Sequence, residues 1–126
     1  MKADMHLNHI NLPVPDVAAS AGFLREYFCL TDLGPKATPA IALLTDDHGA
    51  IITLSNFNHA AKVDWPGAFH IGFVRDSRAA VDAVHARLTG AGHKASPPRL
   101  FHGSWTFYVE APGGFTIEVQ HFEGRA

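Results

Sequence analysis

The stretch FYVEAPGGFTIEV, residues 107–119, predicts two strands joined by a tight turn. Aromatic and β-branched residues flank the turn PGG (112–114), a combination typical of a β-hairpin. The second strand carries Glu118 between Ile117 and Val119, in a run that otherwise looks buried. Because carboxylates are rarely buried unless they are paired or bound to a metal, Glu118 is a candidate functional residue.

A similar hairpin is predicted in the first half of the chain. Strands are expected at 40–46 and 50–57, joined by the turn DDHG. Before them, residues 7–14 predict a strand, and 16–30 predict an amphipathic helix with an aspartate cap. We expect Gly34–Pro35 to break that helix.

The second half repeats this plan. A strand is predicted at 68–74, a helix at 75–92 with an Asp/Ser start and a Gly stop, and an extended segment at 94–101. Superposing the halves places His9 on His70 and the motif DHGAIITLS on PGGFTIEVQ. The two halves are therefore interpreted as copies of one unit.

We predict an α+β fold in which two βαβββ modules form a curved mixed sheet around a cleft. The first module is expected at about residues 5–57, a linker at about 58–67, and the second module at about 68–123. Together they make a single domain, as a chain of 126 residues favours.

The composition excludes several classes of function. The chain is 47% apolar with a net charge of −2, and its basic residues are scattered, so we expect no nucleic-acid partner. No apolar run is long enough for a membrane span. The single Cys29, expected to pack on a helix face, excludes an internal disulfide and favours the cytoplasm. Nine histidines invite a metal interpretation but also raise the chance of an accidental match.

This plan resembles the vicinal-oxygen-chelate superfamily, which includes glyoxalase I, fosfomycin-resistance enzymes, bleomycin-resistance proteins and extradiol dioxygenases. The resemblance runs from His9 to about Phe122. It implies that His9, His70 and Glu118 hold one divalent ion, with iron(II) or manganese(II) favoured. Two imidazoles and a carboxylate on one side of an ion leave positions open for substrate. A lone histidine would more often have a structural role. The metal interpretation is favoured because His9 and His70 occupy equivalent positions in the two halves.

Thr53 distinguishes this chain from the glyoxalase I branch of the superfamily. It falls on Glu118 in the superposition, where glyoxalase I has a second carboxylate that acts as ligand and base. Threonine cannot take up a proton at neutral pH, so glyoxalase I activity is not expected. Bleomycin-binding relatives generally lack the metal triad, which leaves the extradiol and fosfomycin-type branches.

A second motif resembles the extradiol signature. His102, Tyr108, the turn at 111–114 and Glu118 follow its order, with a spacer one residue shorter than usual. The resemblance implies that His102 and Tyr108 are catalytic and hydrogen-bond the substrate oxygens. The structural alternatives are that His102 is a surface-loop residue and that Tyr108 bridges strands.

Two departures keep other activities open. Ring-cleaving relatives carry a further histidine near the end of the first module, where this chain has none, and they are usually longer. His59 follows in the linker and is not assigned that role, and no role is assigned to His121. A fosfomycin-type transferase or hydrolase fits the length better, but it needs cations, and only Arg99 and Lys94 are near the expected cleft.

We therefore expect a metal-dependent enzyme with extradiol-dioxygenase-like activity on a catecholic or other vicinal-oxygen small molecule. The alternatives are a fosfomycin-resistance-like enzyme and a non-catalytic binding protein. We expect a homodimer, with ligands from one chain or from two. Aromatic and apolar residues beside the ligands in sequence suggest an apolar pocket, in which Asn11 could hydrogen-bond a substrate oxygen. Its expected substrate-binding residues are Asn11, Thr53, Phe73 and Trp105.

Overall fold

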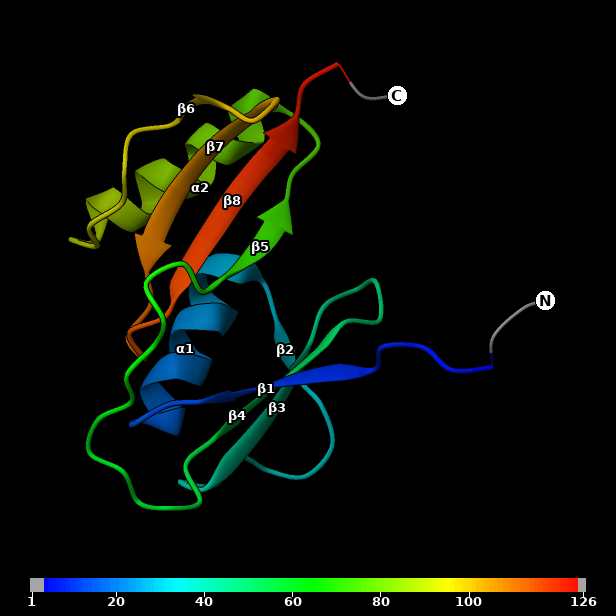
Figure 1. Ribbon diagram of the computed structural model, residues 1–126, viewed down its shortest axis with the longest axis vertical. Coiled ribbons are helices and arrows are strands. Elements are labelled where there is room, and N and C mark those ends of the chain that lie inside the picture. Colours follow the sequence, from blue (N-terminus) through cyan, green and yellow to red (C-terminus); the bar gives the residue numbers. More distant parts are fainter. Residues whose placement is uncertain (1–3, 125–126) are drawn as a thin grey trace. The chain divides into compact units, whose positions relative to one another are not determined.

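The computed structural model describes residues 4–124 and divides the chain into two compact units, Met1–Val63 and Asp64–Ala126. Each unit has a four-stranded mixed sheet and one helix (Figure 1). This arrangement confirms the predicted α+β fold and its two βαβββ modules. The boundary between the units falls inside the segment 58–67.

The first unit has one parallel and two antiparallel strand pairs. Its sheet order is β1-β4-β3-β2, with β1 parallel to β4 and the other neighbours antiparallel. The sequence located every element except the two-residue strand β2, which is too short to show a pattern. The elements are β1 (His9–Pro13), α1 (Val17–Phe28), β2 (Thr31–Asp32), β3 (Ile41–Thr45) and β4 (Ile51–Ser55).

The second unit repeats this topology. Its sheet order is β5-β8-β7-β6, with β5 parallel to β8 and the other neighbours antiparallel. The elements are β5 (His70–Val74), α2 (Arg78–Gly90), β6 (Arg99–Phe101), β7 (Ser104–Glu110) and β8 (Thr116–Phe122).

The strand registers confirm the superposition of the two halves. His9 and His70 are the first residues of β1 and β5, the edge strands that pair in parallel with the last strand of each unit. In β4, Thr53 pairs with the third residue of β1, and in β8, Glu118 pairs with the third residue of β5. Thr53 therefore holds the register position in the first unit that Glu118 holds in the second.

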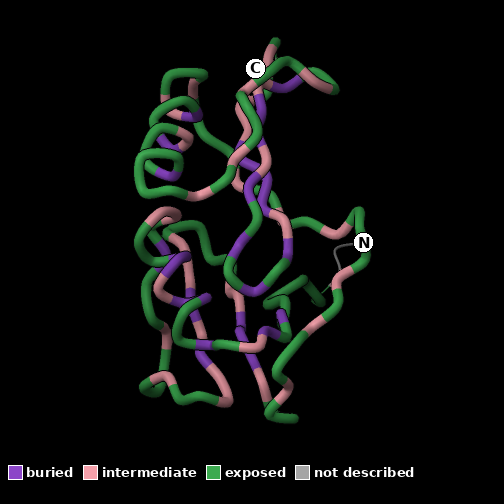
Figure 2. Tube along the Cα trace, turned by 90° about the vertical axis from the view of Figure 1, so that its left-hand side faces the viewer, coloured by how far each residue is buried: buried purple, intermediate pink, exposed green. Residues whose placement is uncertain are grey.

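One face of each sheet packs against the helix of its unit, α1 on β3 and β4, and α2 on β7 and β8. Buried positions recur along the strands and on the helices (Figure 2). The alternation of side chains along a strand leaves the other face for polar groups. The buried residues of the helix-facing sides are Leu12, Ala42, Leu44 and Leu54 with Ala21 and Leu24, and Phe107, Val109, Ile117 and Val119 with Val81, Val84 and Leu88.

Helix α1 ends earlier than the sequence indicated. Cys29 forms its C-cap with φ 57, in the left-handed region, and its backbone N–H bonds to the carbonyl of Leu24. The helix therefore ends at Phe28, six residues before Gly34, and Cys29 is exposed rather than packed on a helix face. The left-handed turn of the chain, and not the Gly-Pro pair, ends the helix.

Helix α1 begins at a side-chain cap whose removal gives a first test. The Asp16 carboxylate accepts a hydrogen bond from the N–H of Ala19 at 3.0 Å. Asp16→Ala is expected to lower the free energy of unfolding by about 1 kcal/mol, because that N–H loses its partner. Urea denaturation measures the change. The control Asp47→Ala alters an exposed turn residue and should change stability little; equal effects of the two substitutions would contradict the capping role.

Trp65 ties the start of the second unit to the β7–β8 turn. Its indole N–H donates to the carbonyl of Gly113 at 3.1 Å, and its ring stacks on Phe69 and meets the edge of Phe115. Gly114 has φ +89, and a Cβ there would lie 3.6 Å from the Trp65 ring. The turn therefore uses glycine for its backbone conformation and is covered by the indole.

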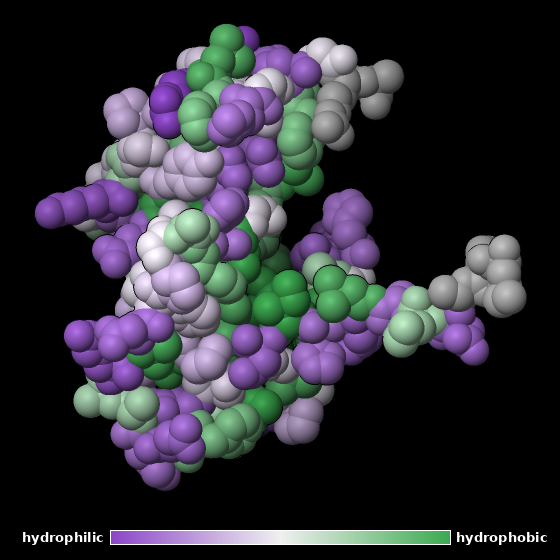
Figure 3. All heavy atoms as spheres, viewed as in Figure 1, coloured by the Kyte–Doolittle hydropathy of each residue, from purple (hydrophilic) through white to green (hydrophobic). Residues whose placement is uncertain are grey.

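The surface carries both hydrophobic and hydrophilic residues, which are interspersed on the face shown in Figure 3. Among residues 4–124, no helix is both long and apolar enough to cross a membrane. The exposed large hydrophobic residues include Ile10 on β1 and Val74 on β5, both on edge strands.

Candidate metal site

Glu118 lies on the face of the second sheet that points away from α2. Its neighbours Ile117 and Val119 are 0% and 1% exposed on the helix-facing side. Glu118 itself is 9% exposed, so the carboxylate is buried without being part of the apolar core. The residue that pairs with it on β5 is Gly72, which has no side chain to cover it on that side.

His70 faces this carboxylate from the neighbouring strand β5. Its Nε2 lies 3.5 Å from Glu118 Oε1, across two neighbouring strands. That distance exceeds the ~2.7–3.2 Å of an N–H···O hydrogen bond. Two ligand atoms that share one ion, each roughly 2.1 Å from it, lie about 3.0–3.5 Å apart. The pair therefore has the separation of two metal ligands.

The hydrogen bonds of these two side chains leave the facing atoms available. His70 Nδ1 lies 3.0 Å from the carbonyl oxygen of Ala68, which can only accept, so Nδ1 carries the proton. In the neutral ring Nε2 then keeps its lone pair. Glu118 Oε2 accepts a hydrogen bond from the Thr106 hydroxyl at 2.7 Å, which leaves Oε1 toward His70. Outer hydrogen bonds of this kind orient ligands in known metal sites.

Tyr108 borders the pair. It is the cross-strand partner of Glu118 on β7, and its ring meets His70 edge-on with centroids 6.0 Å apart. Burial raises the pKa of the Tyr108 hydroxyl above its ordinary value; a hydrogen bond with Glu118 and the charge of that carboxylate raise the pKa further, and Arg99 opposes them. At neutral pH Tyr108 is therefore a protonated hydrogen-bond donor beside the carboxylate.

His9 in the first unit repeats the arrangement of His70. Its Nδ1 lies 3.0 Å from the side-chain oxygen of Asn8. An amide oxygen accepts hydrogen bonds, so this contact places the proton on Nδ1 and leaves Nε2 with its lone pair. Both strand-initial histidines thus present the same ring nitrogen.

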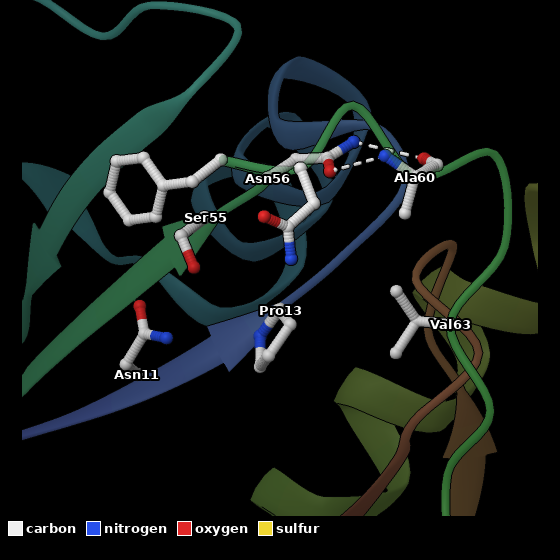
Figure 4. Close-up of a pocket in the computed structure, with 8 residues that line it drawn as sticks. Asn11, Pro13, Ser55, Asn56, Ala60 and Val63 are labelled. Atoms are coloured by element: carbon white, nitrogen blue, oxygen red, sulfur yellow. Dashed lines mark hydrogen bonds between the residues drawn. The ribbon is translucent and has the colours of Figure 1, made fainter.

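The first unit has a concave pocket of about 280 Å³ on the face that carries Asn11 (Figure 4). Thr53 is buried and donates to Asn11 Oδ1 at 2.9 Å, so Asn11 still offers its amide nitrogen as a hydrogen-bond donor. Asn56 holds the loop wall through hydrogen bonds with Ala60 and Pro15. The lining residues are Asn11, Pro13, Ser55, Asn56, Phe57, Asn58, Ala60 and Val63.

Phe73 and Trp105 lie on the other face of the second sheet. Phe73 pairs with Val119, and the Trp105 indole donates to Asp82 of α2 at 2.8 Å with Arg78 of the same helix over its ring. Both therefore belong to the helix-facing side. This corrects the expectation that aromatic residues beside the ligands in sequence also border them in space, because successive strand residues point to opposite faces.

The structure does not bring His102 to the Glu118 pair. His102 and Gly103, with φ 51 and 77, form the turn between β6 and β7, and His102 is exposed. At roughly 3.3 Å per residue, this turn lies about 20 Å along β7 from Tyr108. His121 alternates to the Trp105 side and bonds to the carbonyl of Arg75, and His59 is exposed in a loop of the first unit.

Over residues 4–124, no group of three His, Cys, Asp or Glu side chains forms a complete metal-binding cluster. The second unit supplies two candidate ligands, His70 and Glu118, and the first supplies His9. The sequence did not single out Thr106, although its even spacing from Tyr108 and Glu118 on a hairpin predicts that it shares their face.

The repeated βαβββ topology, with the His70–Glu118 pair on the open face of the second sheet, agrees with the family to which the chain is matched. The chain belongs to the Glyoxalase/Bleomycin resistance protein/Dioxygenase superfamily, whose family model matches residues 6–119. This superfamily includes enzymes, the glyoxalases and dioxygenases of its name among them. A comparison with curated protein sequences gave no match.

Solved structures support the same assignment. A protein described as a possible glyoxalase from Bacillus cereus is 44% identical, with a TM-score of 0.81 over 92% of this chain and 98% of that one. The fosfomycin resistance protein FosX from Listeria monocytogenes is 19% identical, with a TM-score of 0.75 over 91% and 89%. An antibiotic binding protein from Streptomyces is 20% identical, with a TM-score of 0.73 over 98% and 100%. The last two share the fold.

Proposed function

We propose that the protein is a metal-dependent enzyme that holds one divalent ion through His9, His70 and Glu118 and acts on a small molecule with two neighbouring oxygens. The observation that carries the proposal is the His70–Glu118 pair, 3.5 Å apart with its outer atoms already hydrogen-bonded. A buried carboxylate that faces an imidazole lone pair without a hydrogen bond between them is arranged to share a cation.

The third ligand is proposed to come from β1. Two ligands do not make a site, and His9 has the same register position and the same free nitrogen as His70. Both histidines start edge strands, whose unpaired backbone groups favour pairing with another strand. We propose that this pairing joins modules within one chain or across a homodimer, and that it completes the site.

The proposed reaction is extradiol-type oxidation of a catecholic substrate. The ring bond beside the two oxygens breaks and both atoms of dioxygen enter the product, so no other oxidant or reductant is needed. The bound ion, iron(II) or manganese(II), would supply Lewis-acid and redox chemistry. Tyr108 would donate a hydrogen bond to a substrate oxygen next to Glu118, and Asn11 would offer its amide nitrogen to the substrate. His102 has no role in this proposal.

Arg99 supports a second candidate. It pairs with Thr106 across β6 and β7, and its positive charge acts on Tyr108, so it lies on the Glu118 face. A cation there suits an anionic substrate such as a phosphonate, and the fold is shared with FosX. A fosfomycin-type activity is therefore the alternative to test. Thr53, in place of a carboxylate, argues against glyoxalase I chemistry.

Metal loading tests the proposal first. The purified protein is stripped with a chelator, loaded anaerobically with iron(II) or with manganese(II), and analysed for bound metal. One ion per complete site is expected. Oxygen uptake is then measured with catechol, 4-methylcatechol and 3,4-dihydroxybenzoate, and loss of fosfomycin is measured with the manganese-loaded protein.

The outcomes separate the candidates. Catechol-dependent oxygen uptake supports dioxygenation, and fosfomycin loss without oxygen uptake supports the alternative. If the metal-free protein binds neither ion, the enzyme proposal is overturned and a binding protein, like the Streptomyces relative in fold, becomes the better description.

A further inference from the structure

Thr106 is a fully buried polar residue of β7, with 0% of its surface exposed. Its hydroxyl lies 2.7 Å from Glu118 Oε2 and 3.2 Å from the carbonyl oxygen of Val119. The short contact to the carboxylate is that of a charge-assisted hydrogen bond. The Thr106 hydroxyl therefore donates to Oε2, one of the two carboxylate oxygens of Glu118.

This contact decides which carboxylate oxygen is available. With Oε2 held by Thr106, only Oε1 faces His70 Nε2. A free carboxylate can bind a cation through either oxygen or through both. The Thr106 hydroxyl favours binding through one, because a carboxylate that turned to use both would lose a hydrogen bond in a buried place.

We propose that Thr106 is a positioning residue that fixes Glu118 as a one-oxygen ligand and so keeps a coordination position free for substrate. This inference depends on the proposed function, since it needs the His70–Glu118 pair to bind an ion. The first unit lacks this hydroxyl. Its residue equivalent to Thr106 is Ile41, because Ile41 pairs with Ser55 as Thr106 pairs with Gln120. The hydroxyl is therefore particular to the unit that carries the carboxylate.

Metal affinity of three variants tests the inference. Thr106→Val removes the hydroxyl and keeps the shape, Thr106→Ser keeps the hydroxyl, and Thr89→Val removes an exposed helix hydroxyl as a control. Chelator-stripped proteins are titrated with manganese(II) by calorimetry. Thr106→Val is expected to lower the affinity about 10–100-fold, as loss of an outer-sphere partner does. Thr106→Ser should restore most of it, and Thr89→Val should match the wild type.

Two further readings distinguish positioning from a structural role. Urea denaturation of the metal-free proteins reports the stability cost of each substitution separately from metal affinity. The visible spectrum of the cobalt(II)-loaded proteins reports coordination, and it should change in Thr106→Val if Glu118 binds through both oxygens. A purely structural threonine would lower stability and leave both metal readings unchanged.

The failures can be told apart. If the wild type binds manganese(II) and Thr106→Val binds it equally tightly with an unchanged cobalt spectrum, the role of Thr106 is overturned and the proposed function stands. If the wild type binds no metal, both fail.

Discussion

Glu118→Ala is expected to abolish metal binding by the protein. Its carboxylate is the only charged group that contacts His70 in the described part of the second unit, residues 64–124. The affinity for manganese(II) should fall by more than the roughly 10–100-fold of an outer-sphere substitution, because a ligand itself is lost. Calorimetric titration of the chelator-stripped variant measures the loss. Glu110→Ala is the control, since it removes an exposed carboxylate at the end of β7.

The fold is expected to survive this substitution. When Glu118 is removed, the Thr106 hydroxyl still has the carbonyl of Val119 at 3.2 Å. Thr106, the fully buried donor, therefore keeps an acceptor, and the half-buried Tyr108 hydroxyl, which also hydrogen-bonds Glu118, can bond to water instead, so the cost in stability should be small. Glu118→Gln keeps the size of the side chain and gives a second reading. Metal binding that persists in both variants would contradict the proposed site, whereas loss of the urea transition would point to a structural carboxylate.

The repeat made most of the fold predictable. His9 and His70 open matching strands, and both hairpins carry clear turn residues, so the repeated order of elements followed from aligning the halves, whereas the parallel pairing of first and last strands is seen only in the structure. What the sequence could not show was local. Strand β2 has only two residues, too few to show an alternating pattern. Helix α1 ends because Cys29 adopts a left-handed backbone conformation, which is not expected for a cysteine from its sequence alone.

Strand alternation predicted the sheet face of Glu118 correctly, whereas proximity in sequence assigned Phe73 and Trp105 to the wrong face. Glu118 alternates with two core residues, and its orientation away from α2 followed from that alone. Trp105 is an odd number of residues from Tyr108, so alternation would have placed it on the helix side. His102-Gly103 lies between two paired strands, and this dipeptide was an overlooked signal for a tight hairpin turn.

Phe107→Ala is expected to destabilise the protein more than the loss of a helix cap or of an exposed side chain does. Phe107 is 0% exposed, pairs with Val119, and meets the ring of His85 of α2 edge-on at 5.1 Å. Deleting such a ring leaves a cavity between sheet and helix, and the free energy of unfolding should fall by about 3–5 kcal/mol. Urea denaturation followed by tryptophan fluorescence measures it, because both tryptophans, Trp65 and Trp105, belong to the second unit.

The control for this substitution is Phe57→Ala in the first unit. Phe57 is 65% exposed, so its loss should change stability by no more than about 0.5 kcal/mol. Comparable losses in the two variants would contradict the assignment of Phe107 to the core. The substitution also bears on the site. Phe107 packs on the far side of the strand pair that holds Tyr108 and Glu118 in register. If that packing fixes the open face, Phe107→Ala should weaken metal binding even under conditions in which the protein remains folded.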